Sequence, residues 1–144
     1  MVNIIFNASL ICYLLSGLGY TLYLVFRNSI VKQFSVYLLG LGLFSHTVTI
    51  SLRSIDTGHG PYTTGFEIAS FLAWVIVVIY FCIEFKYKIK DLGAFVIPVV
   101  FLILLFSAFQ SREFSLIDES TTMFWLTMHR TLSIIGYAAF AIAF

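Results

Sequence analysis

Charged side chains are scarce in this sequence. Only 10% of its 144 residues are Asp, Glu, Lys or Arg, whereas 60% are hydrophobic, and the mean hydropathy is +1.01. Soluble domains carry about 25% charged residues, so the chain lacks the charge that a water-facing surface needs. Apolar stretches of 18 or more residues recur, and such stretches span a bilayer as helices. The sequence therefore predicts an all-α, polytopic transmembrane helical bundle with the lipid bilayer as its partner, and it excludes a soluble domain.

The net charge is close to zero, and the sequence has only two cysteines. The formal net charge is +1, and no basic stripe carries interleaved aromatic residues, so no nucleic-acid partner is expected. The two cysteines, Cys12 and Cys82, lie far apart in apolar stretches and form no C-x-x-C motif, which favours a packing role over thiol chemistry. The N-terminal stretch lacks the basic start and the cleavage site of a signal peptide, so we expect it to remain as a membrane helix.

Five apolar stretches are expected to form the membrane helices of a single transmembrane domain over residues 1–144. Their predicted bounds are about 3–26, 34–52, 65–85, 92–109 and 123–144. The last stretch ends without the basic or aromatic flank that usually anchors a membrane helix. We therefore expect the chain to be the N-terminal part of a longer family domain.

The loops between these stretches differ in charge. Two short connections hold five basic residues: Arg27, Lys32, Lys86, Lys88 and Lys90. The two longer loops, 53–64 and 110–122, hold fewer. Because basic loops stay in the cytoplasm, this pattern predicts that the N-terminus and both longer loops lie on the outer side of the membrane.

Several residues predict local features of the helices. Gly17 and Gly19 are small enough to let neighbouring helices approach closely. Thr64 is a candidate N-cap for the third helix, and Pro98 is expected to kink the fourth. The second half of the second helix is unusually polar for a membrane segment, so we expect it to face other helices or a cavity. Its polar residues are Ser45, His46, Thr47, Thr49 and Ser51.

Two histidines are predicted to lie inside the membrane. His46 would lie roughly 9 Å, and His129 roughly 10 Å, below the outer ends of their helices. Ionisable residues at such depth are rare and are usually functional. A buried histidine that hydrogen-bonds to a neighbouring serine or threonine is the alternative, and it is a stronger alternative for His46 than for His129.

The helical neighbours of His129 strengthen its case. Trp125, His129, Ser133 and Gly136 share one helix face, which reads aromatic, imidazole, small, small. Such a face leaves a flat space beside the imidazole, as an axially ligated porphyrin needs, and imidazole is a common axial ligand of heme iron. The side chain of the adjacent Arg130 is expected either to pair with a heme propionate or to extend to the outer membrane interface.

A polar loop precedes the third helix and contains Gly58-His59-Gly60-Pro61. Glu67 follows near the start of that helix, on one face with Phe71 and Trp74. A carboxylate is favoured near a helix N-terminus, so Glu67 is expected either to belong to a functional site, or to cap the loop or pair with Arg53. His59 and Pro61 are expected to be structural loop residues, with His59 exposed to water.

At these residues the chain resembles the CcsA/ResC-type cytochrome c assembly proteins, a heme-handling membrane family with a HemX-like branch. The resemblance is carried by an ordered set of motifs: Arg53, Gly58-His59-Gly60-Pro61, Glu67, Phe71 to Trp74, Leu92-Gly93, Pro98, Trp125 to His129, and Gly136-Tyr137-Ala138. It covers most of the chain from about residue 40. The sequence departs from the family at Thr64 and Gly65, where asparagine is frequent.

The resemblance implies a function and a site. A membrane protein of this kind holds heme b near the outer membrane face for attachment to apocytochrome c. His129 would be an axial ligand of the iron, with His46 a second candidate ligand. Aromatic packing against the macrocycle would come from Trp125 and Trp74, and propionate contacts from Arg53 or Arg130. In the family, a second histidine ligand and a tryptophan-rich loop follow further along the chain, and neither occurs in this sequence.

The resemblance also implies partners and a location. Apocytochrome c and a second cytochrome c assembly membrane protein are the expected partners, and the bacterial inner membrane is the expected site. Whether the chain is itself an enzyme stays open, because it would form part of a holocytochrome c synthase (heme lyase). Two other functions compete: a cytochrome b-type subunit in which His46 and His129 ligate one heme, and a non-catalytic membrane subunit of a larger complex.

Overall fold

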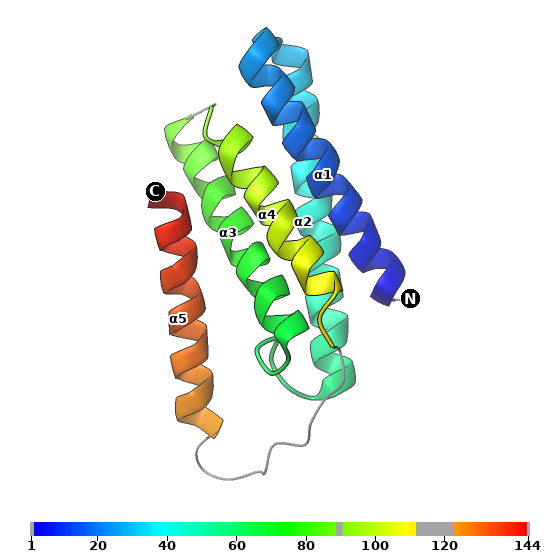
Figure 1. The fold of residues 1–144 in the computed structure, drawn as a ribbon, viewed down its shortest axis with the longest axis vertical. Coiled ribbons are helices and arrows are strands. Elements are labelled where there is room, and N and C mark those ends of the chain that lie inside the picture. Colours follow the sequence, from blue (N-terminus) through cyan, green and yellow to red (C-terminus); the bar gives the residue numbers. More distant parts are fainter. Residues whose placement is uncertain (1, 89–90, 112–122, 144) are drawn as a thin grey trace.

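The computed structural model describes residues 2–88, 91–111 and 123–143, with the side chains of 123, 124, 126 and 127 left aside. Five helices account for most of this part of the chain (Figure 1): α1 (Val2–Phe26), α2 (Ser29–Thr57), α3 (Gly65–Tyr87), α4 (Gly93–Ala108) and α5 (Met123–Ala143). The described ranges contain no strand. The all-α prediction is confirmed. Most of the predicted loop 110–122, and Lys90, lie outside the described residues.

The first four helices form a ring, and α5 lies outside it (Figure 1). In this ring α1 packs against α2 and α4, and α3 packs against α2 and α4. α5 packs against α3. Large side chains fill the centre of the ring and are almost completely buried: Tyr13, Tyr20, Leu39, Ile76, Tyr80, Ile97 and Leu104.

Three of the described helices are long and apolar enough to cross a membrane, namely α1, α2 and α3. α4 is also apolar but has only 16 residues. Large hydrophobic side chains remain exposed along the outside of the bundle, for example Ile4, Phe44 and Phe95. A surface of this kind suits hydrocarbon rather than water, so the chain is a membrane protein built from several helices.

α2 is longer at both ends than the predicted 34–52. Asn28 caps its N-terminus by accepting a hydrogen bond from the Ile30 amide, and Gly58, with φ 73°, ends it in the left-handed conformation. The prediction that Lys32 lies in a connection is therefore wrong, because the helix begins at Ser29. Arg53 likewise lies within α2, and the predicted loop 53–64 shortens to 58–64.

Small residues bring α1 close to its neighbours, as predicted. A Cβ atom on Gly19 would lie 2.1 Å from the Ser35 hydroxyl oxygen, and one on Gly17 would lie 3.5 Å from the backbone nitrogen of Pro98. Ser16 adds a hydrogen bond between α1 and α2, from its hydroxyl to the Ser35 carbonyl at 2.9 Å. A side chain at Gly19 would displace Ser35, whereas a Cβ atom at Gly17 would make an ordinary van der Waals contact with α4.

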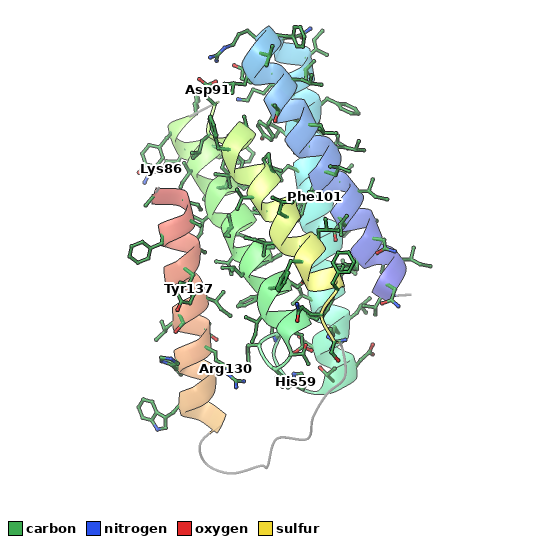
Figure 2. All side chains as sticks on the ribbon, in the orientation of Figure 1. His59, Lys86, Asp91, Phe101, Arg130 and Tyr137 are labelled. Carbon is green, nitrogen blue, oxygen red and sulfur yellow. The ribbon has the colours of Figure 1, made fainter. Side chains whose placement is uncertain are left out.

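The bundle has two chemically different ends. We call the end with residues 58–64 the loop end, and the end with Arg27, Lys32, Lys86 and Lys88 the basic end. Figure 2 shows His59 and Arg130 at the loop end, with Lys86 and Asp91 at the opposite one. At the basic end Arg27 donates a hydrogen bond to Asp91 at 2.6 Å, which ties the α1–α2 connection to the residues preceding α4.

Candidate functional site

Glu67 organises the loop end. Its side chain is 2% exposed, and one carboxylate oxygen, Oε1, accepts a hydrogen bond from Arg53 Nε at 2.7 Å. The other, Oε2, accepts from the backbone amides of Thr63 and Thr64 at 3.0 and 3.1 Å. The Thr64 hydroxyl accepts from the Glu67 amide in return, which completes a capping box and confirms Thr64 as the N-cap of α3. Glu67 therefore both caps the loop and pairs with Arg53.

His59 turns inward, and the expectation that it is exposed to water is wrong. Its side chain is only 8% exposed. Its Nδ1 atom lies 2.9 Å from the Gly60 carbonyl oxygen, 3.1 Å from the Thr63 hydroxyl and 3.9 Å from Glu67. The loop curls in this way because Glu67 gathers the Thr63 and Thr64 amides beneath it. His59 and the neighbouring Pro61 belong to this folded loop.

His129 occupies a different environment. It lies in the first half of α5 with its imidazole exposed, next to Trp125, which is 74% exposed. Further along the same face of α5, a Cβ atom on Gly136 would meet no described atom within 4 Å, so the helix is open at this position. Arg130 points back to the bundle and donates a hydrogen bond from Nη1 to the Tyr62 carbonyl at 3.2 Å.

His46 is fully buried between three helices. Its Nε2 atom lies 2.8 Å from the Ser70 hydroxyl on α3, and its Nδ1 atom lies 3.3 Å from the Tyr13 hydroxyl on α1. The Tyr13 ring also meets the imidazole edge-on, with ring centroids 5.8 Å apart. Both ring nitrogens are thus engaged by protein groups, as in the alternative in which His46 is a buried structural histidine.

Trp74 faces α2 rather than α5. Its Nε1 donates to the Thr47 hydroxyl at 2.9 Å, and its ring stacks on Phe71 with centroids 5.8 Å apart. Among the described residues, no hydrogen bond or ring contact joins Trp74 to His129. The structure therefore places the two tryptophans of the predicted site, Trp74 and Trp125, on different helices without bringing them together.

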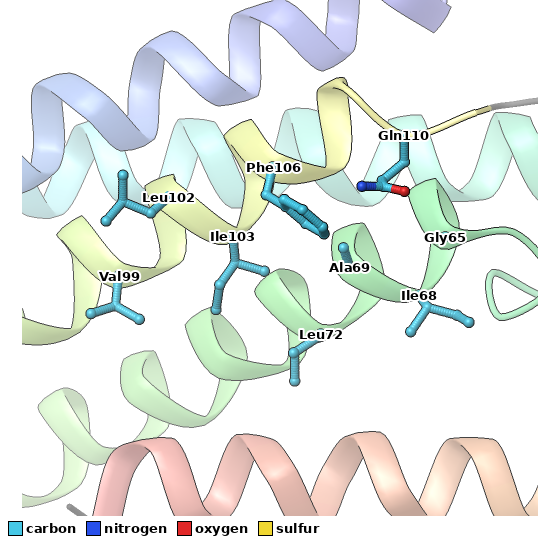
Figure 3. A pocket seen from close by; sticks show the side chains of 9 residues that line it. All are labelled: Gly65, Ile68, Ala69, Leu72, Val99, Leu102, Ile103, Phe106 and Gln110. Carbon is cyan, nitrogen blue, oxygen red and sulfur yellow. The ribbon is translucent and has the colours of Figure 1, made fainter.

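A groove between α3 and α4 has a volume of about 560 Å³ (Figure 3). Its lining is apolar apart from Gln110, which lies beside Gly65 at the loop end. His129 does not line this groove. A smaller cavity of about 390 Å³ lies between α3, α4 and the second half of α5, and His129 does not line it either.

One cluster was not anticipated from the sequence. Glu84, in the last turns of α3, accepts a hydrogen bond from the Tyr20 hydroxyl at 2.6 Å and pairs with Lys32 at 3.2 Å. The ring of the fully buried Tyr80 packs edge-on against Tyr20. The sequence does hold one sign of this cluster, namely the acidic Glu84 within an apolar stretch, because a carboxylate inside a membrane needs a partner. It does not show which residues are the partners of Glu84.

Comparison with known proteins identifies what the chain resembles. It is 33% identical to the cytochrome c biogenesis protein CcsA of Chlorella vulgaris over 109 residues, covering 69% of this chain. CcsA of Mesostigma viride is 26% identical over 138 residues, covering 92% of this chain, and CcsA of Guillardia theta is 27% identical over 145 residues, covering 94%. The chain is of the CcsA type.

The similarity covers only part of each relative. The matches cover 33%, 45% and 47% of these three relatives, so the CcsA-type chain spans about a third to a half of their length. A further match is the CcsA protein of the bacterium Prochlorococcus marinus, 29% identical over 136 residues. No family model matches the chain, and no solved structure matches it.

One histidine of this CcsA-type chain is placed where it could hold a heme iron. Of the three histidines, all of which the structure describes, His46 and His59 are turned inward against protein partners, whereas His129 is exposed. An exposed imidazole beside an open helix face suits an axial ligand. Among the described residues, the structure brings no second histidine into contact with His129.

Proposed function

We propose that this CcsA-type chain acts in cytochrome c biogenesis by holding heme b at the loop end of the bundle through His129. The observation that carries the proposal is the exposed imidazole of His129 on the open face of α5, next to an arginine that ties this part of the helix to the folded loop. The CcsA relatives, whose printed name is cytochrome c biogenesis protein, supply the biological context.

Each residue at this position has a distinct part in the proposal. His129 is the axial ligand, and Trp125 packs against the macrocycle from the preceding turn of the same helix. Arg130 stays on the protein side through its bond to the Tyr62 carbonyl and offers its remaining guanidinium donors to a propionate. Arg53 is committed to Glu67 and supports the loop instead. Bound heme would supply the vinyl groups that join the cysteine thiols of apocytochrome c.

The proposal extends to location and partners. The loop end would face the outer side of a bacterial inner membrane or an equivalent membrane, since the basic end carries the lysines that favour the cytoplasm. Apocytochrome c would approach His129 from that side. A second cytochrome c assembly membrane protein would complete the site, and together they would form a holocytochrome c synthase.

The test is heme binding by the purified full chain. After addition of heme in detergent, wild-type protein should show a Soret band and the spectrum of a histidine-ligated heme. His129→Gly should lose that ligation, and added imidazole should restore it, because the free ligand can enter the space left by the side chain. His46→Ala should keep the wild-type spectrum. A wild-type protein without any Soret band under these conditions would overturn the proposal.

A further inference from the structure

The first half of α5 is joined to the bundle by a hydrogen bond. Among its described side chains, none before Ile134 is buried, and the buried residues Ile134 and Ala138 both lie in the second half. The hydrogen bond from Arg130 to the Tyr62 carbonyl, 3.2 Å long, ties this half of α5 to the loop end. Since His129 is the adjacent residue, a bond that holds this part of α5 also sets where the His129 backbone lies relative to the loop end.

The Tyr62 carbonyl is in turn fixed by the folded loop. The Tyr62 amide donates to the Gly60 carbonyl at 2.9 Å, and the Tyr62 ring lies so close to Gly60 that a Cβ atom there would clash with it. The next two amides, those of Thr63 and Thr64, donate to the Glu67 carboxylate. The position of the carbonyl thus depends on the contacts of Glu67.

We propose that Glu67 is a positioning residue for His129, acting through loop 58–64 and Arg130. The chain of contacts runs from Arg53 on α2, through Glu67 on α3 and the loop, to Arg130 on α5. Each link is a hydrogen bond of 2.7 to 3.2 Å. The carboxylate is suited to this role because its two oxygens accept from a cation and from two amides at once, while 2% exposure shields these bonds from water. The assignment of heme to His129 rests on the proposed function, whereas the mechanical coupling does not.

Glu67→Gln tests the coupling with little change in volume. Glutamine replaces one acceptor oxygen by an NH₂ donor, which must then face either Arg53 or the loop amides. Glu84→Gln is the matched control, since Glu84 is also a buried carboxylate of α3, with one cation and one hydroxyl partner, but at the basic end. Arg130→Ala and Arg130→Lys test the last link without touching the Glu67 carboxylate.

The first readout needs no heme. Spin labels on Ile55→Cys in α2 and Leu132→Cys in α5, both exposed positions, report the distance between the two helices after Cys12 and Cys82 are replaced by serine. We expect a narrow distance distribution in the parent protein and in its Glu84→Gln form. It should broaden and shift in Glu67→Gln and Arg130→Ala, and Arg130→Lys should restore it in part. An unchanged distribution in folded Glu67→Gln and Arg130→Ala proteins would overturn the proposal.

The second readout separates this inference from the proposed function. If the parent protein binds heme, Glu67→Gln should change the ligand spectrum at His129, and added imidazole should restore a histidine-ligated spectrum, while Glu84→Gln leaves it unchanged. If the parent protein binds no heme but the label distances respond as expected, the coupling stands and the proposed function fails. If the parent protein binds heme but the label distances do not respond to the substitutions, the proposed function stands and the coupling fails.

Discussion

The Nε2 atom of His46 in α2 lies 2.8 Å from the hydroxyl oxygen of Ser70 in α3. This contact joins two neighbouring helices of the ring, and the Tyr13 hydroxyl of α1 lies 3.3 Å from the other nitrogen of the imidazole. An imidazole with both nitrogens engaged must lose a protein partner before it can ligate iron. The arrangement favours a structural histidine at His46 and leaves His129 as the ligand candidate.

The first prediction follows from that contact. His46→Ala removes a fully buried side chain and leaves the Ser70 and Tyr13 hydroxyls without it, which costs about 1–3 kcal/mol per unsatisfied buried group. The melting temperature of the purified protein, followed by intrinsic fluorescence in detergent, should fall clearly. Heme content should stay at the wild-type level. A cytochrome b-type subunit ligated by His46 and His129 predicts the opposite result, namely loss of heme.

The sequence predicts the local contacts of this chain better than the distant ones. The capping box of Thr64 and Glu67 spans three residues and is readable as T-x-x-E before an apolar run. The inward turn of His59 is not readable, because it depends on how Glu67 draws the loop amides together. The sequence likewise does not show that Arg130 bonds to the backbone carbonyl of Tyr62, 68 residues earlier in the chain.

The distant contacts are obscure for a physical reason that is specific to membranes. A helix in a bilayer is apolar on its lipid side as well as on its buried side, so periodicity does not show which face packs inward. α3 is hydrophobic all round, and its polar residues Glu67, Ser70 and Glu84 mark the buried directions instead. These residues show that partners exist. The sequence offers Arg53 as one alternative for Glu67, but only the fold shows that Ser70 meets His46 and that Glu84 meets Lys32 and Tyr20.

The second prediction concerns the close contact of α2 with α1. A Cβ atom on Gly42 would lie 2.7 Å from the buried Tyr13 ring and 3.0 Å from the Cβ atom of Cys12. Gly42→Ala therefore forces the two helices apart, and overpacking of this kind costs about 1–3 kcal/mol. Thermal unfolding in detergent should occur at a lower temperature. Because Tyr13 also contacts His46, the effect should reach the centre of the ring.

Gly136→Ala is the matched control for Gly42→Ala. A Cβ atom at position 136 meets nothing within 4 Å, and alanine is the better helix former by about 1 kcal/mol. The melting temperature should stay the same or rise slightly. Equal destabilisation by both substitutions would show that the close approach of α1 and α2 is not the cause.

The third prediction concerns the ion pair at the basic end. The side chains of Lys32 and Glu84 are 18% and 9% exposed, so removal of the lysine leaves a largely buried carboxylate with Tyr20 as its remaining hydrogen-bond partner. Loss of one partner of a buried pair costs about 3–5 kcal/mol, and the partial exposure of Lys32 places the expected cost of Lys32→Met near the lower limit. Chemical unfolding of the purified protein measures it.

A double variant distinguishes the interaction between Lys32 and Glu84 from the effects of each substitution alone. Lys32→Met combined with Glu84→Gln removes both charges, so its stability should lie above that of Lys32→Met alone. Arg27→Ala, which breaks the exposed pair with Asp91, should leave unfolding almost unchanged because water screens that interaction. Additive losses in the double variant would argue against a coupled pair.

The last prediction concerns orientation, on which the proposed heme site depends. In a protein whose Cys12 and Cys82 are replaced by serine, Asp56→Cys places an exposed thiol at the loop end and Tyr87→Cys places one at the basic end. A membrane-impermeant maleimide added to intact cells should label the first thiol, and the second only after permeabilisation, because the lysines of the basic end favour the cytoplasm. Neither substitution removes a basic residue, so the topogenic signal stays intact. The reverse labelling pattern would place His129 near the cytoplasmic surface, where heme held there could not meet an apocytochrome c on the outer side.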